Sequence, residues 1–379
     1  MRNFTYHYPV KQHFGKGCTE EAIRSELKKV GRNVLLAYGG GSVKRSGLYD
    51  KIIAWLDEAG KNVTEFGGIM PNPTYAKVQE GARLVRENAI DFILAVGGGS
   101  VMDCCKIVSA QSQTEEDVWD MEYVAHRYPT AFVPMGAVVT ASGTGAEQNN
   151  GAVITHEEKR LKQALFGAYY DFAILDGDLT KTLPMQQVIS GAFDTFSHCM
   201  EIYMGHPHAT NLSDEINEAI MRNIIVNLRA VIANPDDDFA RGELMWASAM
   251  AENGLLKLGK QTDFQCHMIE HAVGAYTDCN HGQGLAVIHP VLYRHIYKSA
   301  ESKFQRWAQG VWDVSSASNG IQALANFIRE VKLPTSFTEM GLSLDEATLK
   351  AIAESTIITA GCCRQLTHDD IFTILKECI

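Results

Sequence analysis

Two short apolar runs in the first half of the chain end in the same four residues, Gly-Gly-Gly-Ser, and a helical pattern follows each of them. These two runs cover residues 33–38 and 92–96, and further strand-like runs lie near residues 4–14, 61–66, 131–135, 152–155 and 172–175. Strands that are apolar throughout and alternate with helices are typical of a mainly parallel sheet covered on both faces. We therefore expect an α/β fold with ligand-binding loops at the carboxyl ends of its strands.

The pattern changes after residue 183. No strand-like run bounded by turn residues recurs beyond that point, and nine helical patterns follow, at about residues 186–203, 212–233, 238–257, 262–274, 284–298, 301–314, 317–331, 344–354 and 368–377. We predict two domains, an α/β domain over residues 1–183 and an all-helical domain over residues 184–379.

The two glycine-rich loops suit a phosphate. Glycines between a strand and a helix let backbone N–H groups approach an anion closely, and the helix N-terminus adds the positive end of its dipole. Neither loop matches G-x-G-x-x-G or a Walker A sequence, and a single such loop is explained equally well as an ordinary turn. Two of them favour nucleotide binding. A third segment, from Thr140 to Gly145, offers hydroxyls for a pyrophosphate or ribose, or is simply a polar loop.

The first loop runs directly into Lys44 and Arg45, and no acidic residue stands at its glycines. An acidic residue there would bind a ribose 2′-hydroxyl, whereas basic residues favour a 2′-phosphate. The sequence therefore favours NADP(H) over NAD(H). The alternative is that both residues are solvated parts of a helix.

Histidines gather in residues 264–290, which contain His267, His271, His281 and His289. The first two are four residues apart in an apolar helical setting and so share one helix face. Upstream, Asp194 and His198 have the same spacing on another apolar helix. Imidazoles and a carboxylate suit a divalent metal such as Fe(II) or Zn(II). A single histidine of this kind is more often a core residue, but the positions together favour a metal site.

Composition narrows the class of partner and compartment. The net charge of −11 argues against a nucleic-acid or anionic-membrane partner, and no apolar run is long enough to span a bilayer. The N-terminus has no secretory signal pattern. The nine cysteines include two vicinal pairs but no C-x-x-C, which favours reduced thiols and a cytoplasmic protein. The aromatic residues between Phe4 and His13 suggest an edge strand that pairs two copies into a homodimer or larger assembly.

Taken together, these motifs resemble the iron-containing (group III) alcohol dehydrogenase family, and more closely its NADPH-dependent butanol dehydrogenase or aldehyde reductase branch. The resemblance runs from Phe14-Gly15-Lys16-Gly17 to the histidine segment and so spans nearly the whole chain. It implies a Rossmann-like dinucleotide-binding domain followed by a helical metal-binding domain. The implied metal ligands are Asp194, His198, His267 and His281, with His271 nearby but not a ligand. Because an imidazole can transfer protons near neutral pH, we expect His271 to act as a catalytic proton relay. The resemblance implies that the cofactor is bound by Gly97, Gly98, Gly99, Ser100, Thr140, Thr144 and Lys162. Together with the first loop, the full set of predicted cofactor-binding residues adds Gly39, Gly40, Gly41, Ser42, Lys44, Arg45 and Asp103.

The expected activity is metal-dependent hydride transfer between NADP(H) and a small substrate, interconverting primary alcohols such as butanol and their aldehydes. One departure from the family pattern is Ala146, which stands where relatives often have serine after Thr144-Gly145. The alternatives are a glycerol dehydrogenase-like polyol oxidoreductase, a dehydroquinate synthase-like lyase, or a non-catalytic nucleotide or metal binder. A metal-dependent hydrolase would leave both glycine loops unexplained.

Overall fold

The computed structural model describes residues 2–379 and divides them into two compact units. One unit runs from Tyr8 to Leu183, and the other begins at Pro184 and ends at Ile379. The N-terminal segment through His7 groups with the second unit, whereas the sequence suggested that it belongs to the first. No helix in residues 2–379 is both long and apolar enough to cross a membrane.

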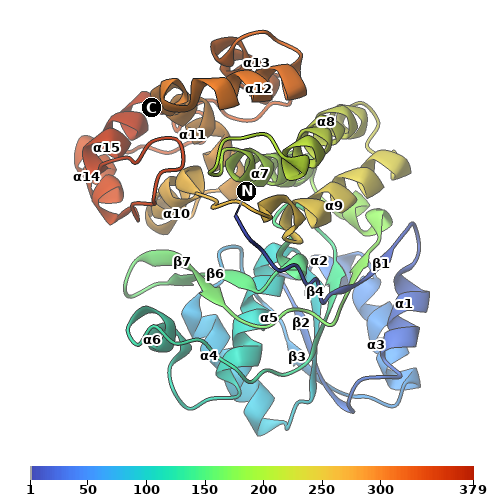
Figure 1. The fold of residues 1–379 in the computed structure, drawn as a ribbon. Coiled ribbons are helices and arrows are strands. Elements are labelled where there is room, and N and C mark those ends of the chain that lie inside the picture. The colour runs from blue at the N-terminus through green and yellow to red at the C-terminus, as the bar shows by residue number, and fades with distance from the viewer. Residues whose placement is uncertain (1) are drawn as a thin grey trace. The chain divides into compact units, whose positions relative to one another are not determined.

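The first unit is built on a six-stranded sheet in the order β1-β8-β5-β4-β2-β3 (Figure 1). All five neighbouring pairs are parallel. The strands are β1 (Lys11–Phe14), β2 (Asn33–Tyr38), β3 (Asn62–Phe66), β4 (Phe92–Gly97), β5 (Met135–Val139) and β8 (Phe172–Leu175). All residues of β4, β5 and β8 are buried, as expected for strands covered on both faces. The predicted parallel α/β fold is therefore confirmed.

Helices connect these strands. They are α1 (Thr19–Glu26), α2 (Ser42–Arg45), α3 (Leu48–Glu58), α4 (Tyr75–Glu87), α5 (Gly99–Gln111) and α6 (Val118–Tyr123), with short 3₁₀ turns η1 (Ala146–Gln148) and η2 (Gly177–Thr182). The side chain of Thr74 caps α4 by accepting a hydrogen bond from the backbone N–H of Lys77. Helix α5 is buried from Val101 to its end, so the second glycine loop opens onto the most enclosed helix of this unit.

Two parts of this unit differ from the sequence prediction. Strands β6 (Gly151–His156) and β7 (Leu161–Phe166) form a separate antiparallel pair, and only the first of them was expected. The β7 sequence LKQALF is rich in good helix formers, so its strand conformation depends on pairing with β6 rather than on its own propensity. At the N-terminus only Lys11–Phe14 is a strand, and Pro9, two residues before it, has no N–H to donate to a ladder.

The second unit contains the helices that the sequence predicts (Figure 1). They are α7 (Met185–Tyr203), α8 (Leu212–Ala233), α9 (Asp238–Glu252), α10 (Gln265–Thr277), α11 (His281–Ile296), α12 (Glu301–Trp312), α13 (Ala317–Glu330), α14 (Glu346–Ser355) and α15 (His368–Glu377), with 3₁₀ turns η3 (Leu255–Lys257) and η4 (Tyr297–Ala300). Helix α7 packs against α8, α9 and α11 and is buried along most of its length. Polar residues on α7 therefore lie inside the core of this unit.

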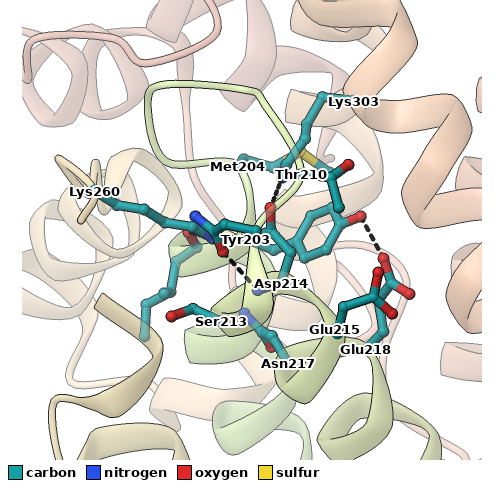
Figure 2. Close-up of polar contacts among 12 residues, drawn as sticks. Tyr203, Met204, Thr210, Ser213, Asp214, Glu215, Asn217, Glu218, Lys260 and Lys303 are labelled. Atoms are coloured by element: carbon teal, nitrogen blue, oxygen red, sulfur yellow. Dashed lines mark hydrogen bonds and ion pairs between the residues drawn. The ribbon is translucent and has the colours of Figure 1, made fainter. Parts of the chain in front are cut away.

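A buried ionic cluster fixes the carboxyl end of α7 (Figure 2). The Asp214 carboxylate on α8 binds both Lys260, which precedes α10, and Lys303 on α12, at 2.6 Å in the latter case. The Lys303 ammonium lies 4.0 Å from the ring centroid of Tyr203, whose hydroxyl donates to Glu218 at 2.7 Å. Such a cluster is weak evidence for net stability, but removing one charge from it is costly. It ties the end of α7 to three other segments.

Candidate metal centre and cofactor-binding loops

The centre of α7 carries two buried polar side chains one turn apart, Asp194 and His198. The Asp194 Oδ1 atom has no hydrogen-bond partner among residues 2–379 and lies 3.7 Å from the His198 Nε2 atom. An unpaired carboxylate oxygen in a helical core is costly unless another group binds it. This oxygen is therefore the natural centre of a ligand site.

Two further imidazoles reach the same oxygen from α10 and α11. His267 lies near the start of α10 and His281 opens α11, and their Nε2 atoms lie 3.6 Å and 3.4 Å from Asp194 Oδ1. The turn between these helices places Asp278 in the left-handed region, with φ of 51°, and Asn280 caps α11 by accepting from the backbone N–H of Gln283. The turn between α10 and α11 thus returns His281 to the site.

These distances fit a shared divalent cation. Ligand atoms at about 2.1 Å from a tetrahedral ion are about 3.4 Å apart, which matches the three distances to Asp194 Oδ1. The His267 Nε2 atom also lacks a hydrogen-bond partner among the described residues. Burial lowers the pKa of His198 to about 4, so this imidazole is neutral at pH 7 and able to bind a metal. Burial opposes ionisation of Asp194, but the surrounding imidazoles outweigh it and lower its pKa well below the ordinary value.

The second nitrogen of each of these imidazoles faces a glutamate, which the sequence reasoning missed. Glu201 accepts from His267 Nδ1, Glu270 accepts from His281 Nδ1, and Glu252 Oε1 lies 3.8 Å from His198 Nδ1. A carboxylate on Nδ1 leaves Nε2 as the metal-binding atom and orients the ring. The available sequence signal was three buried glutamates within largely apolar helices, two of which lie three residues after a histidine of the site: Glu201 after His198 and Glu270 after His267.

Glu201 and Asp194 together also affect the protonation of His267. Burial alone would lower the pKa of His267, but the two carboxylates outweigh that effect and raise it to about 10. Binding of a cation to its Nε2 atom would therefore release a proton, as is usual for imidazole ligands. The site should bind metal more tightly as the pH rises.

His271 lies on α10 one turn after His267 and is buried. Its ring centroid is 6.1 Å from that of His267 and 5.6 Å from that of His281. Donor atoms of His271, Glu270 and His281 all lie within 4.8 Å of one another. The structure thus brings His271 beside the proposed ligands, and its role as proton relay stays a prediction. The fourth histidine, His289, is a core residue whose Nε2 atom lies 2.6 Å from the Ser197 hydroxyl.

The first glycine loop joins β2 to α2 in the α/β unit. It contains Gly39, Gly40 and Gly41, the last with φ of 97°, and Ser42 begins α2. Next to the loop, a cavity of about 220 Å³ has Ser42, Lys51 and Thr140 among its lining residues. Lys44 and Arg45 are exposed on α2.

An acidic residue does lie close to this loop, although none is near it in the sequence. Glu65 comes from the end of β3, and its Oε2 atom is 3.2 Å from the Lys44 ammonium. The register of the parallel sheet pairs Leu36 with Glu65, which brings the two strand ends together. The sequence has no acidic residue at the glycines of this loop, and the structure adds a carboxylate from β3 beside Lys44.

The second loop is packed too tightly for any residue but glycine at two positions. A Cβ atom on Gly99 would lie 2.2 Å from the hydroxyl oxygen of Thr144, and one on Gly97 would lie 2.5 Å from the Val101 side chain. The backbone N–H of Thr140 donates to the Gly97 carbonyl at 2.8 Å. The second and third loops thus contact one another, with Gly98 and Ser100 at the start of α5. Backbone N–H groups at a helix N-terminus are what a pyrophosphate needs.

Two other predicted cofactor residues lie deeper in the unit. The Asp103 carboxylate on α5 accepts a hydrogen bond from the backbone N–H of Val153 at 2.9 Å and is 3.5 Å from the Lys106 ammonium. Asp103 thus joins α5 to β6. Lys162 is buried on β7, opposite Thr155 on β6.

A parallel-sheet unit with glycine loops and a helical unit with one carboxylate amid three imidazoles are the parts of a metal-dependent dehydrogenase. Comparison with family models matches "Iron-containing alcohol dehydrogenase" at residues 9–177 and "Fe-containing alcohol dehydrogenase family, C-terminal" at residues 188–379. The chain belongs to the iron-containing alcohol dehydrogenase family. Membership implies a divalent metal and a nicotinamide cofactor.

Individual relatives span the full chain. A probable NADH-dependent butanol dehydrogenase 1 from Bacillus subtilis is 37% identical over 390 residues, covering 99% of each chain. The NADPH-dependent aldehyde reductase YqhD from Escherichia coli is 35% identical over 381 residues, covering 97% of each chain. Among solved structures, NADH-dependent butanol dehydrogenase A from Thermotoga maritima has a TM-score of 0.93 at 32% identity, covering 100% of this chain and 99% of that one.

Proposed function

We propose that the chain is an NADP(H)-dependent alcohol dehydrogenase that interconverts primary alcohols, such as butanol, with their aldehydes, and that aldehyde reduction is its working direction. The observation that carries the proposal is the unpaired Asp194 Oδ1 atom, which has three imidazole Nε2 atoms 3.4, 3.6 and 3.7 Å away. The names of relatives, which include butanol dehydrogenases and an aldehyde reductase, support the substrate class.

In this proposal Asp194, His198, His267 and His281 hold Fe(II) or Zn(II). A bound divalent cation supplies Lewis acidity, which polarises a carbonyl oxygen and stabilises the developing alkoxide. Glu201 and Glu270 keep His267 and His281 in the tautomer that offers Nε2. His271 delivers the proton that converts alkoxide to alcohol, since its ring lies beside that of His281.

The Tyr8–Leu183 unit is proposed to bind the cofactor and the helical unit the metal. Backbone N–H groups from Gly97 to Ser100 would hold the pyrophosphate, with Thr140 and Thr144 toward the nicotinamide and Lys162 toward a ribose. NADPH is proposed as the preferred cofactor, because the residue that follows β2 is Gly39 rather than an acidic residue, and the basic residues Lys44 and Arg45 follow on α2.

A cofactor assay tests this proposal. Purified protein is incubated with butanal and either NADPH or NADH, and nicotinamide oxidation is followed at several concentrations of each. We expect turnover that requires both butanal and the nicotinamide cofactor, and a larger kcat/KM for NADPH than for NADH. Equal kcat/KM values would contradict the cofactor preference alone. No turnover of any aldehyde or primary alcohol would contradict the reaction itself.

The chain is also proposed to form a homodimer. β1 is the terminal strand of the sheet order and ends at Phe14, and Phe14 is more than two-fifths exposed, as are Phe4 and Tyr6 earlier in the sequence. An edge strand beside exposed aromatic residues is a favourable surface for pairing with a second copy. Light scattering at micromolar concentration should give twice the 41.8 kDa chain mass or more. A monomeric mass would contradict the proposal.

A further inference from the structure

A compact polar cluster stands beside the first glycine loop, and neither the proposed metal site nor the pyrophosphate loop uses it. Glu65 lies at the end of β3, and the parallel register brings it next to the last residues of β2. Its Oε2 atom accepts hydrogen bonds from the Tyr38 hydroxyl at 2.5 Å and from the Lys44 ammonium at 3.2 Å. One carboxylate oxygen therefore holds both the last residue of β2 and the cation of α2.

The cluster fixes the position of Lys44. Its ammonium lies 4.9 Å from the ring centroid of Tyr38 and 4.4 Å from that of Tyr49, and these two rings make an edge contact with centroids 5.7 Å apart. A solvated helix lysine would have none of these partners. Lys44 is therefore a placed charge, with a carboxylate on one side and two aromatic rings around it.

Both charges of the pair persist at neutral pH and remain reachable from solvent. Hydrogen bonds with Tyr38 and Glu65 raise the pKa of Lys44, and the hydrogen bond from Tyr38 is the main reason that the pKa of Glu65 is lowered. Their side chains are 46% and 45% exposed, respectively. A ligand that approaches Lys44 thus meets a fixed negative charge about as accessible as the positive one.

We propose that Glu65 is a specificity-determining residue for the adenosine ribose of the cofactor, which rests on the proposed binding of NADP(H) at this loop. In many dinucleotide-binding folds an acidic residue at the end of the second strand accepts a hydrogen bond from the ribose 2′-hydroxyl. Here Gly39 follows that strand, and the carboxylate comes from the neighbouring strand. Glu65 thus accepts from a 2′-hydroxyl and repels a 2′-phosphate, which carries a charge of roughly −1.5 to −2.

The consequence is a smaller difference in affinity between NADP(H) and NAD(H). Lys44 attracts the 2′-phosphate, while Glu65 partly cancels that attraction and keeps the unphosphorylated cofactor usable. Removing the Glu65 charge should strengthen binding of the phosphorylated form and weaken binding of the other. Removing the Lys44 charge should do the reverse. If the Glu65–Lys44 ion pair did not contact the cofactor, removing either charge would not change the affinity for one form of the cofactor relative to the other.

Binding without turnover tests this directly. ADP-ribose and its 2′-phosphate are titrated calorimetrically into wild type, Glu65→Gln and Lys44→Met, with Glu116→Gln as the matched control. Glu116 is an exposed carboxylate of the same unit that pairs with Arg127. Wild type should bind both ligands. Glu65→Gln should shift the ratio of the two dissociation constants about fivefold or more toward the 2′-phosphate, and less so in high salt. Lys44→Met should shift it the other way, and Glu116→Gln should leave it unchanged.

The outcomes separate the inference from the function on which it rests. If wild type binds both ligands but Glu65→Gln has the same ratio of dissociation constants as Glu116→Gln, Glu65 is only a surface ion-pair partner and the inference is wrong. If wild type binds neither ligand, dinucleotide binding at this loop is wrong and the inference falls with it. A ratio that shifts as expected supports the inference whichever cofactor the wild type prefers.

Discussion

Substituting Glu201 by glutamine should weaken metal binding without removing a metal ligand. Glu201 accepts from His267 Nδ1 and also from the backbone N–H groups of Cys266 at 2.6 Å and His267 at 3.3 Å. Glutamine replaces a charge-assisted bond by a neutral one and places an amide N–H against backbone donors. A hydrogen bond to a charged group is worth about 1 to 2 kcal/mol more than a neutral one, which corresponds to roughly 5–30-fold in affinity.

Substitutions of residues that hydrogen-bond a metal ligand usually lower metal affinity by about 10–100-fold. We therefore expect Glu201→Gln to lower metal affinity by roughly 5–100-fold. The assay is competition between the metal-free protein and a chromophoric chelator for Zn(II) at neutral pH. Glu252→Gln is the matched control, because Glu252 lies 3.8 Å from His198 Nδ1, beyond hydrogen-bond distance. Glu252→Gln should lower the affinity for Zn(II) by no more than about threefold. Wild-type affinity in Glu201→Gln, or an equal loss in both variants, would refute the reasoning.

Three further predictions use other parts of the molecule. Gly39→Asp should raise the Kd for NADPH by about tenfold or more through like-charge repulsion, while NADH binding changes little. A Cβ atom at this position would lie 3.2 Å from the Ile69 carbonyl oxygen, so Gly39→Ala is the control for steric strain. An equal rise in the Kd for NADPH in Gly39→Ala would mean that strain, rather than charge, causes the effect. His271→Ala should keep its metal but lower kcat by roughly 10²–10⁴-fold and alter the pH profile, whereas His281→Ala should lose metal; loss of metal in both would make His271 a ligand. Burial opposes ionisation of Glu26, but hydrogen bonds from two lysines and a histidine lower its pKa to about 2. The ionised Glu26 should therefore add about 1–2 kcal/mol to the free energy of unfolding above pH 4.5, and this contribution should disappear as the pH falls toward 2. Urea unfolding of Glu26→Gln should lack this part of the acid dependence, and identical pH curves would contradict it.

The sequence was sufficient for features that depend on local spacing. The pairs Asp194 and His198, and His267 and His271, each share a helix face because they are four residues apart, and the apolar runs before the glycine loops define parallel strands. The helices of the second unit follow from their apolar periodicity. These features need no knowledge of which elements are neighbours.

Features that depend on neighbours could not be predicted in this way. Glu201 reaches His267 across 66 residues, and Glu65 reaches Lys44 only because β2 and β3 are adjacent and in register. Strand β7 forms because β6 offers it a partner, against the helical propensity of its own residues. In each case tertiary packing, rather than the local sequence, decides the contact.

The central claim is that Asp194 and its three imidazoles hold the metal on which the reaction depends, and metal content measured together with turnover tests it most directly. Wild type prepared without oxygen should contain about one divalent metal per chain and reduce butanal with NADPH. Chelation should remove metal and activity in proportion, and Fe(II) or Zn(II) should restore both. Asp194→Ala should bind little metal and remain inactive after the same treatment. Full activity in the metal-free wild type, or wild-type metal content in Asp194→Ala, would contradict the account.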